Sequence, residues 1–321
     1  GAFASTAVVT VTVDSGGSAD SAATDTGGAQ TDGGAGTDGG AADSSCTPWS
    51  AKGAPVTLGG KRPAKVYLPK EWTSCDKPPL VVLLHGFSAT GAIQDIYLGL
   101  SARTNSRGFA LLVPEGTPNK DNKQFWNATD ACCDFYKQGI DDVAYLRGLI
   151  TEATSKLDID PERVSLIGHS NGGFMAFRMA CEASDLVSGV INIAGGVTDD
   201  GAQCTPKRAV NILHIHGTKD KTILYAGGKI GGNGYPSAQA AVDRWSKLNG
   251  CTGEATVGKT LDYDSAPKGA ETTPTTFSTC KEGVEVEFWE MKDSGHIPGF
   301  NDAFKEALAT KATTWKRQGA K

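Results

Sequence analysis

A serine flanked by glycines is the first residue whose surroundings indicate chemistry. Residues 168–172 read Gly-His-Ser-Asn-Gly, so Ser170 stands in a G-x-S-x-G pattern. The pattern follows an apolar run at 164–167 and precedes an amphipathic stretch at 173–183. A serine on such a strand-to-helix turn lies at the carboxyl edge of a sheet, where the N-terminus of the following helix favours a developing anion. We therefore predict that Ser170 is a nucleophile.

A serine hydroxyl needs a general base, and the order of residues along the chain selects one. In a fold with this turn, an acid and then a histidine follow the nucleophile. Of the five histidines, only His296 lies beyond every plausible acid. Asp220 follows the apolar run that ends at residue 215, and we predict that it orients His296. Asp199 and Asp200, after the preceding run, are the alternatives.

Acyl transfer also needs backbone N–H donors for the tetrahedral intermediate. We predict that the amide of Asn171 and the amide of Phe87, in a His-Gly-Phe turn after another apolar run, supply them. His85 in that turn is expected to pack or hydrogen-bond locally. His214 and His216 share one face of a predicted strand, but no third ligand is visible, so we expect a structural role. The sequence implies no metal and no cofactor.

The elements that must position these residues follow an α/β pattern. Short apolar runs, typical of strands buried on both faces, occupy residues 80–84, 109–113, 164–167, 190–193 and 210–215. An alternating run at 284–289 predicts a half-exposed late strand, and 61–68 predicts an antiparallel strand at the sheet edge. Amphipathic stretches predict helices at 91–104, 141–156, 173–183, 238–248 and 301–316. The alternation predicts a doubly wound, mostly parallel sheet, and the interval 193–210 is too short for a large helical lid.

Composition divides the chain into three parts. Residues 46–321 are enough for one large α/β catalytic domain. Residues 14–45 are Gly, Ala, Ser, Thr and Asp apart from one Gln, which predicts a disordered linker because almost no apolar surface is available for burial. Residues 1–13 are either strand-like or a processed N-terminus, and both interpretations stay open. A linker also raises the prospect of an upstream module joined through it.

Charge and hydropathy exclude two classes of function. The formal net charge is −5, and six Asp in the predicted linker account for it, so the rest of the chain is nearly neutral. An electrostatic nucleic-acid binder needs a dense basic face, which a neutral body does not provide. The sequence contains no apolar run of about 18 residues, so we expect no membrane span. We expect a monomer.

The eight cysteines favour disulfides and an oxidising compartment. Zinc is the competing interpretation, but only the vicinal pair at 132–133 is close in sequence. We predict a Cys251–Cys280 bridge, because both residues flank a Gly/Thr/Pro-rich excursion that a bridge would close. The other three predicted pairs have weaker support from the sequence: Cys46–Cys75, Cys181–Cys204 and Cys132–Cys133.

Residues 60–300 resemble the secreted esterase family that includes polyhydroxybutyrate depolymerases and bacterial feruloyl esterases. The matching stretches lie at 80–86, 126–128, 132–133, 139–149, 160–164, 168–177, 180–182, 214–220 and 295–296. The resemblance implies an α/β-hydrolase fold with Ser170, Asp220 and His296 as a triad, and it implies that Trp126 lies near the acyl pocket. One departure is visible. The family commonly has a Trp between the catalytic His and the following Pro-Gly, whereas residues 296–299 here read His-Ile-Pro-Gly. Phe300 is a candidate replacement.

These observations predict a secreted serine esterase that hydrolyses carboxylic esters on polymers through an acyl-enzyme. The candidate substrates are feruloylated polysaccharides and polyesters such as polyhydroxybutyrate or poly(ethylene terephthalate). Two alternatives remain: a catalytically silent polymer-binding module, and a peptidase or acyltransferase on the same fold.

Overall fold

The computed structural model describes residues 48–50, 56–73 and 75–317. The parts predicted at 1–13 and 14–45 lie outside these residues, as does Cys46. None of the helices within the described ranges is long and apolar enough to cross a membrane.

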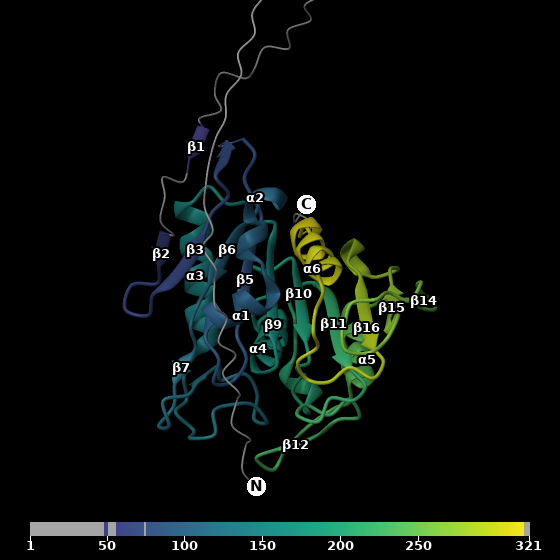
Figure 1. The fold of residues 1–321 in the computed structure, drawn as a ribbon. Helices are drawn as coiled ribbons and strands as arrows, with labels where there is room; N and C mark the ends of the chain where they lie inside the picture. The colour runs from purple at the N-terminus through teal and green to yellow at the C-terminus, as the bar shows by residue number, and fades with distance from the viewer. Residues whose placement is uncertain (1–47, 51–55, 74, 318–321) are drawn as a thin grey trace, which may run out of the picture. The chain divides into compact units, whose positions relative to one another are not determined.

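A ten-stranded sheet forms the centre of the described domain (Figure 1). Its strands, in spatial order, are β14 (Thr256–Val257), β15 (Thr272–Phe277), β16 (Val286–Met291), β11 (Asn211–Gly217), β10 (Gly189–Ile193), β9 (Val164–His169), β5 (Leu80–Leu84), β6 (Ala110–Val113), β3 (Ala64–Tyr67) and β2 (Val56–Leu58). The strands from β16 to β6 run parallel, and those at both ends are antiparallel. This is the mostly parallel α/β sheet that the sequence predicts.

Within the described ranges, three small two-stranded sheets lie outside the main sheet. They pair β1 (Pro48–Ser50) with β4 (Glu71–Thr73), β7 (Thr117–Pro118) with β8 (Gln124–Phe125), and β12 (Gly228–Ile230) with β13 (Asn233–Tyr235).

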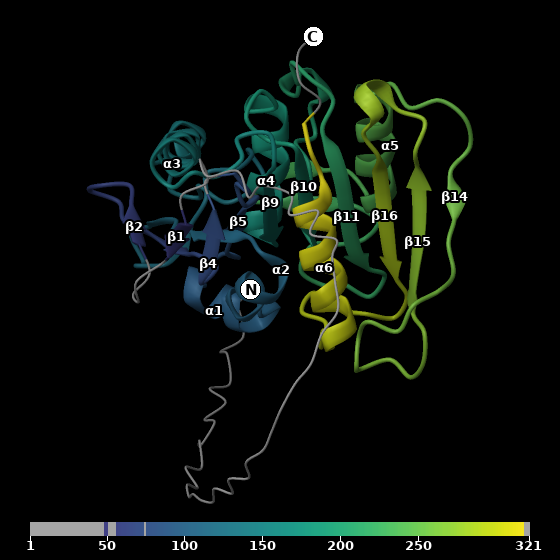
Figure 2. The same cartoon turned by 90° about the horizontal axis from the view of Figure 1, so that it is seen from above.

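Helices cover both faces of the sheet, as Figure 2 shows. One face carries α3 (Asp142–Lys156), α4 (Asn171–Glu182) and α5 (Ala238–Leu248), and the other carries α1 (Gly91–Leu98), α2 (Thr104–Arg107) and α6 (Asp302–Thr314). Side chains alternate between the two layers along each strand. In β5, Val82 and Leu84 pack in the core under α3 and α4, whereas Val81 and Leu83 pack in the core under α1 and α6. Both faces are therefore buried, as the apolar runs indicate.

Two predicted helix boundaries differ from the structure for local reasons. The helix predicted over 91–104 ends at Leu98, because Gly99 adopts the left-handed conformation (φ 62°) that commonly stops helices. A short 3₁₀ turn, η1 (Ser101–Arg103), and α2 follow it. The helix predicted from 173 begins at Asn171, directly after the serine. No α-helix lies between β10 and β11, where only the 3₁₀ turn η2 (Gly201–Gln203) occurs, so this fully described interval carries no large lid.

The sheet extends further at both ends than predicted. The strand within 61–68 is not at the edge, because β3 pairs with β6 on one side and with β2 on the other. The late strand is not half-exposed: β16 lies between β11 and β15, and its Glu287 is buried, accepting a hydrogen bond from Trp289 Nε1 and pairing with Lys311. The excursion after Cys251 is not irregular throughout, since its Thr-rich segment forms β15; Thr is β-branched and suits a strand.

Disulfides join Cys132 to Cys133, Cys181 to Cys204 and Cys251 to Cys280, which are three of the predicted pairs. The fourth predicted pair includes Cys46, which the structure does not describe. The Cys181–Cys204 bridge fastens the end of α4 to the segment between β10 and β11. The Cys251–Cys280 bridge closes the segment that contains β14 and β15.

Candidate active site

Ser170 lies on a sharp turn between β9 and α4. Its backbone has φ 56° and ψ −119°, a conformation that L-residues rarely adopt, and its N–H donates to the carbonyl of Ile193 at 2.8 Å. The flanking glycines make the turn possible. A Cβ at Gly168 would collide with the backbone of Gly172, and one at Gly172 would collide with the carbonyl of Leu84. The turn is thus held in a strained form by the close approach of the first turn of α4 to the ends of β9 and β5.

Three side chains from separate loops converge on this turn. His296 Nε2 lies 3.0 Å from Ser170 Oγ, and His296 Nδ1 lies 2.7 Å from Asp220 Oδ2. The His296 side chain is 14% exposed, whereas that of Asp220 is fully buried. The structure therefore brings together the predicted nucleophile, base and acid in a continuous hydrogen-bonded series.

The carboxylate of Asp220 is fixed from several sides. Its Oδ1 accepts backbone N–H bonds from Thr222 at 2.8 Å and from Ile223 at 2.9 Å. Burial by itself would raise the pKa of Asp220, but hydrogen bonds from His216 and His296 hold that pKa below its usual range. Asp220 is therefore ionised at neutral pH and can stabilise a protonated His296.

The two alternative acids lie elsewhere. Asp200 accepts from the amide of Ala202 at the start of η2, and the Asp199 carboxylate lies close to the backbone of Gly234.

His169, which precedes the serine, holds the base loop in place. Its Nε2 donates to the carbonyl oxygen of His296 at 2.9 Å. Burial lowers the pKa of His169 to about 4, with the nearby His296 adding to the shift, so the ring is neutral at pH 7. Tyr97 packs on His169 and donates from its hydroxyl to the carbonyl of Pro298 at 2.8 Å. This positioning role was not predicted from the sequence, in which the only signal is a histidine inside the G-x-S-x-G motif.

The turn after β5 lies directly beside the serine. A Cβ built on Gly86 would lie 3.5 Å from Ser170 Cβ, which is ordinary van der Waals contact, so the backbone of this turn lies next to the serine. Within the described residues, the Phe87 amide has no hydrogen-bond acceptor. The amide of Asn171 is in the first turn of α4, where a helix offers no acceptor. Two N–H groups near Ser170 are thus available to an oxyanion.

Buried polar contacts hold this turn rigid. The amide of Gly86 donates to Gln94 Oε1 at 3.2 Å. His85 Nε2 accepts from the amide of Gly116 at 2.8 Å, which leaves Nδ1 to donate to the carbonyl of Gly86 at 2.8 Å. Burial lowers the pKa of His85 to about 4, which keeps the ring neutral. His85 thus makes local hydrogen bonds, as expected from the sequence.

Trp126 does not line the site, contrary to the prediction made from the resemblance. The residue has no exposed surface. Its indole Nε1 donates to the carbonyl of His85 at 3.0 Å, and its backbone N–H and C=O bond the side chain of Asn171 at 2.7 and 2.9 Å. Trp126 therefore connects the two segments that carry the free amides, and it offers no ring face to a substrate.

Phe300 does not replace the missing Trp either. Its ring is buried, stacked on Phe304 with ring centroids 3.6 Å apart. The accessible aromatic surface near the serine belongs instead to Phe87 and Phe135, whose rings meet edge to face at 5.4 Å. Phe135 is 48% exposed, and Ile297, next to His296, is 69% exposed. Phe135, which follows the vicinal cysteines by two residues, was not predicted from the sequence.

The remaining histidines pack inside the domain. His214 and His216 lie on β11 with their ring centroids 5.3 Å apart, and His216 Nε2 donates to the carbonyl of Ile223 at 2.8 Å. His214 stacks on Phe288 at 5.6 Å. Within the described ranges, no group of three or more His, Cys, Asp or Glu side chains could hold a metal ion.

Comparisons with known proteins show which family the chain belongs to. A family model described as "Putative esterase" matches residues 56–225, more than half of the chain. Feruloyl esterase B of Piromyces equi is 31% identical over 187 residues, which are 55% of this chain and 32% of that protein. Poly(3-hydroxyalkanoate) depolymerase C of Paucimonas lemoignei is 30% identical over 123 residues, 37% of this chain and 28% of that protein. The matched segment thus spans about a third of each relative.

A solved structure supports the fold. Acetyl xylan esterase from Aspergillus awamori superposes with a TM-score of 0.59 and 14% identity, over 81% of this chain and 100% of that one. At this identity the likeness concerns the fold alone. The mostly parallel sheet with helices on both faces is that of the α/β-hydrolases, as the sequence predicts.

Proposed function

The chain belongs to the esterase family whose model it matches over residues 56–225, and on that premise we propose that it is a secreted serine esterase acting on carboxylic esters carried by a polymer. The observation that carries the proposal is the hydrogen-bonded series from Ser170 through His296 to Asp220. Disulfides support an oxidising compartment, because cytosolic thiols are normally kept reduced.

The first half-reaction forms an acyl-enzyme. His296 Nε2 takes the proton of Ser170 Oγ as the oxygen attacks the ester carbonyl, and Nδ1–H stays bonded to Asp220. The carbonyl oxygen becomes an oxyanion, which the amides of Phe87 and Asn171 can bind. The C–O bond to the alcohol then breaks, and protonated His296 returns its proton to the leaving alkoxide.

The second half-reaction releases the acid. His296 takes a proton from water as the water oxygen attacks the acyl carbonyl, and a second oxyanion forms against the same two amides. Collapse of this intermediate expels Ser170 Oγ, which recovers the proton from His296. Serine, base and acid thus return to their starting states, and none of these steps needs a cofactor.

The surroundings of Ser170 favour an aromatic or extended acyl group. Phe87 and Phe135 form an accessible edge-to-face pair whose outer surface can receive a ring. The interval between β10 and β11 carries no helical lid, so a chain-like substrate meets no cover there. Feruloylated polysaccharides and polyesters both meet these conditions.

Labelling by a fluorophosphonate tests the nucleophile directly. We expect one label on the wild-type protein and none on Ser170→Ala, while the surface variant Ser106→Ala keeps both label and activity. Ester hydrolysis by Ser170→Ala should fall by about 10³-fold or more. Retention of more than about a hundredth of the activity would contradict the assignment.

A substrate panel separates the proposal from its alternatives. A silent polymer-binding module would neither take up the label nor hydrolyse any ester. A peptidase or an acyltransferase would be labelled, but it would prefer amides, or would pass the acyl group to an alcohol in place of water.

A further inference from the structure

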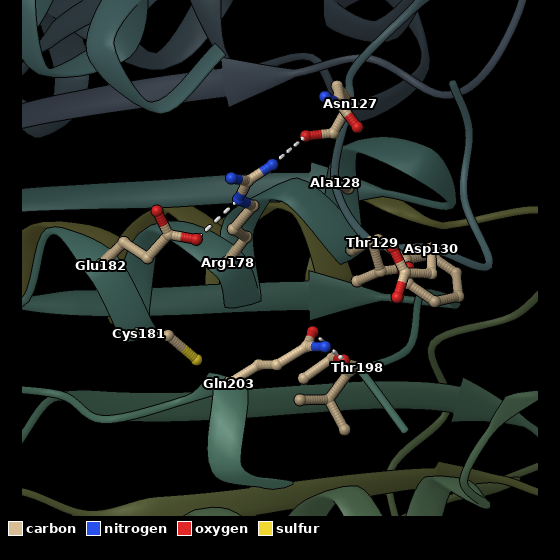
Figure 3. Close-up of a pocket in the computed structure, with 11 residues that line it drawn as sticks. Asn127, Ala128, Thr129, Asp130, Arg178, Cys181, Glu182, Thr198 and Gln203 are labelled. Carbon is tan, nitrogen blue, oxygen red and sulfur yellow. Dashed lines mark hydrogen bonds and ion pairs between the residues drawn. The ribbon is translucent and has the colours of Figure 1, made fainter. Parts of the chain in front are cut away.

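A cavity beside α4 takes no part in the chemistry described above. It has a volume of about 280 Å³ and lies between α4 and the loops at 127–130 and 197–203. Figure 3 shows Arg178 between Asn127 and Glu182, with Asp130, Thr198 and Gln203 on the other sides. A second cavity of about 220 Å³ shares Asp130, Thr198 and Gln203 with the first and extends to Asn233 and Gly234. We call the two together the α4 groove.

The α4 groove begins close to the nucleophile. Phe174, one helical turn beyond Ser170, lines it, and Arg178 and Glu182 follow along the same helix. At 1.5 Å per residue these three positions are about 6, 12 and 18 Å along the axis from the serine. The groove is therefore within reach of a substrate whose ester carbonyl lies at Ser170.

Two segments connect the groove to the mouth of the site. The loop after Trp126 lines the groove with its first residues and carries Phe135 further on, against Phe87. The β12–β13 hairpin lies beside both the aromatic pair and the groove. A Cβ on Gly231 would lie 4.0 Å from the Phe135 ring, and Asn233 Nδ2 donates to the carbonyl of Asp130 at 2.7 Å. The groove and the aromatic pair are thus parts of one continuous rim.

The charges in the α4 groove exclude an anionic ligand. Arg178 is already compensated, since its Nε donates to Glu182 at 2.7 Å and its Nη1 to the carbonyl of Asn127 at 2.7 Å. Asp130 lines both cavities, and Asp199 and Asp200 line the second. The net charge of the lining is negative, so a carboxylate or phosphate would be repelled.

The groove offers both hydrogen-bond acceptors and donors. Its carboxylates are acceptors. Two donors, Arg178 Nη2 and Gln203 Nε2, have no partner among the described residues. The other atom of the Gln203 amide, Oε1, already accepts from the hydroxyl of Thr198 at 3.0 Å. A polyester has carbonyl acceptors but no donors, so it could bond to Arg178 and Gln203 but could not pair with the carboxylates. Sugar hydroxyls donate and accept, and they can satisfy both kinds of group.

From this complementarity we propose that the α4 groove binds the neutral carbohydrate chain that bears the ester. The inference rests on the proposed esterase function and narrows it: the polymer is a polysaccharide, and the acyl group on it lies against Phe87 and Phe135.

Kinetics with matched esters test the groove. We compare a feruloylated arabinoxylan oligosaccharide with methyl ferulate, which has the same acyl group and no sugar. Gln203→Ala and Asp130→Ala should each raise KM for the oligosaccharide ester by about three- to tenfold, because each removes a hydrogen bond to the sugar. Both should leave KM for methyl ferulate unchanged. Asn105→Ala, on α2 at the opposite face of the sheet, is the control and should change neither value.

Binding without catalysis provides a second readout. An unesterified xylo-oligosaccharide titrated into Ser170→Ala should bind, and adding Gln203→Ala should weaken that binding by about three- to tenfold. Any one of three results would overturn the proposal. They are an equal KM for the oligosaccharide ester in all variants, no binding of the xylo-oligosaccharide, and preferential binding of a hydroxybutyrate oligomer. A wild-type protein that neither takes up the fluorophosphonate label nor hydrolyses any ester would instead overturn the esterase function itself.

Discussion

Replacing Phe135 with alanine tests which aromatic surface receives the acyl group. Phe135 is 48% exposed and meets Phe87 edge to face at 5.4 Å. An aromatic contact of this kind contributes about 0.5–1.5 kcal/mol beyond the area buried. If a ferulate ring packs there, Phe135→Ala should lower kcat/KM for methyl ferulate by about 2- to 12-fold relative to methyl butyrate. The two esters share their leaving group, so the ratio isolates the acyl contact.

Stability measurements separate this effect from unfolding. Because Phe135 is half-exposed, its alanine variant should melt near the wild-type temperature. Trp126 is fully buried and bonded to His85, so Trp126→Ala should cost about 3–5 kcal/mol of unfolding free energy. Tyr136→Ala, which removes the next aromatic along the loop, is the matched control and should leave the ferulate-to-butyrate ratio unchanged. An unchanged ratio in well-folded Phe135→Ala would refute the acyl assignment.

Three further predictions concern the framework of the site. The pKa of Asp220 is lower in the folded chain than in the unfolded one. The ionised carboxylate therefore stabilises the fold above about pH 4, and this contribution is lost as the pH falls through the folded pKa. Asp220→Asn should therefore flatten the acid side of a plot of melting temperature against pH. Gly172→Ala should abolish activity and lower the melting temperature, because its Cβ would meet the carbonyl of Leu84, and an active variant would contradict the close approach. Replacing Cys181 and Cys204 together by alanine should cost about 3 kcal/mol, measured by urea unfolding, since the bridge closes a segment of 23 residues; finding free thiols at both positions in the wild-type protein would contradict the bridge.

The sequence predicted those structural features that depend on residues close to one another along the chain. The glycines at 168 and 172 indicated a sharp turn around Ser170, because turn chemistry depends on the residues in the turn itself. The inner strands were predictable for the same reason: a run such as Leu80–Leu84 is apolar on both faces only if both faces are covered. Chain order then selected His296 and Asp220, and the structure places both beside the serine.

The tertiary structure decided which side chains are accessible. Trp126 and Phe135 are both aromatic residues of one loop, and nothing in their neighbouring residues distinguishes a buried ring from an exposed one. Trp126 is buried because Asn171, 45 residues later, and His85, 41 residues earlier, bond to it. The late strand β16 is buried because core side chains cover both of its faces, those of α5 on one side and those of α6 on the other. Burial depends on segments that are distant in the sequence, and local periodicity does not contain this information. The sequence by itself therefore determined the helices, the strands and the catalytic residues that they position. Long-range packing determined which surface a substrate meets.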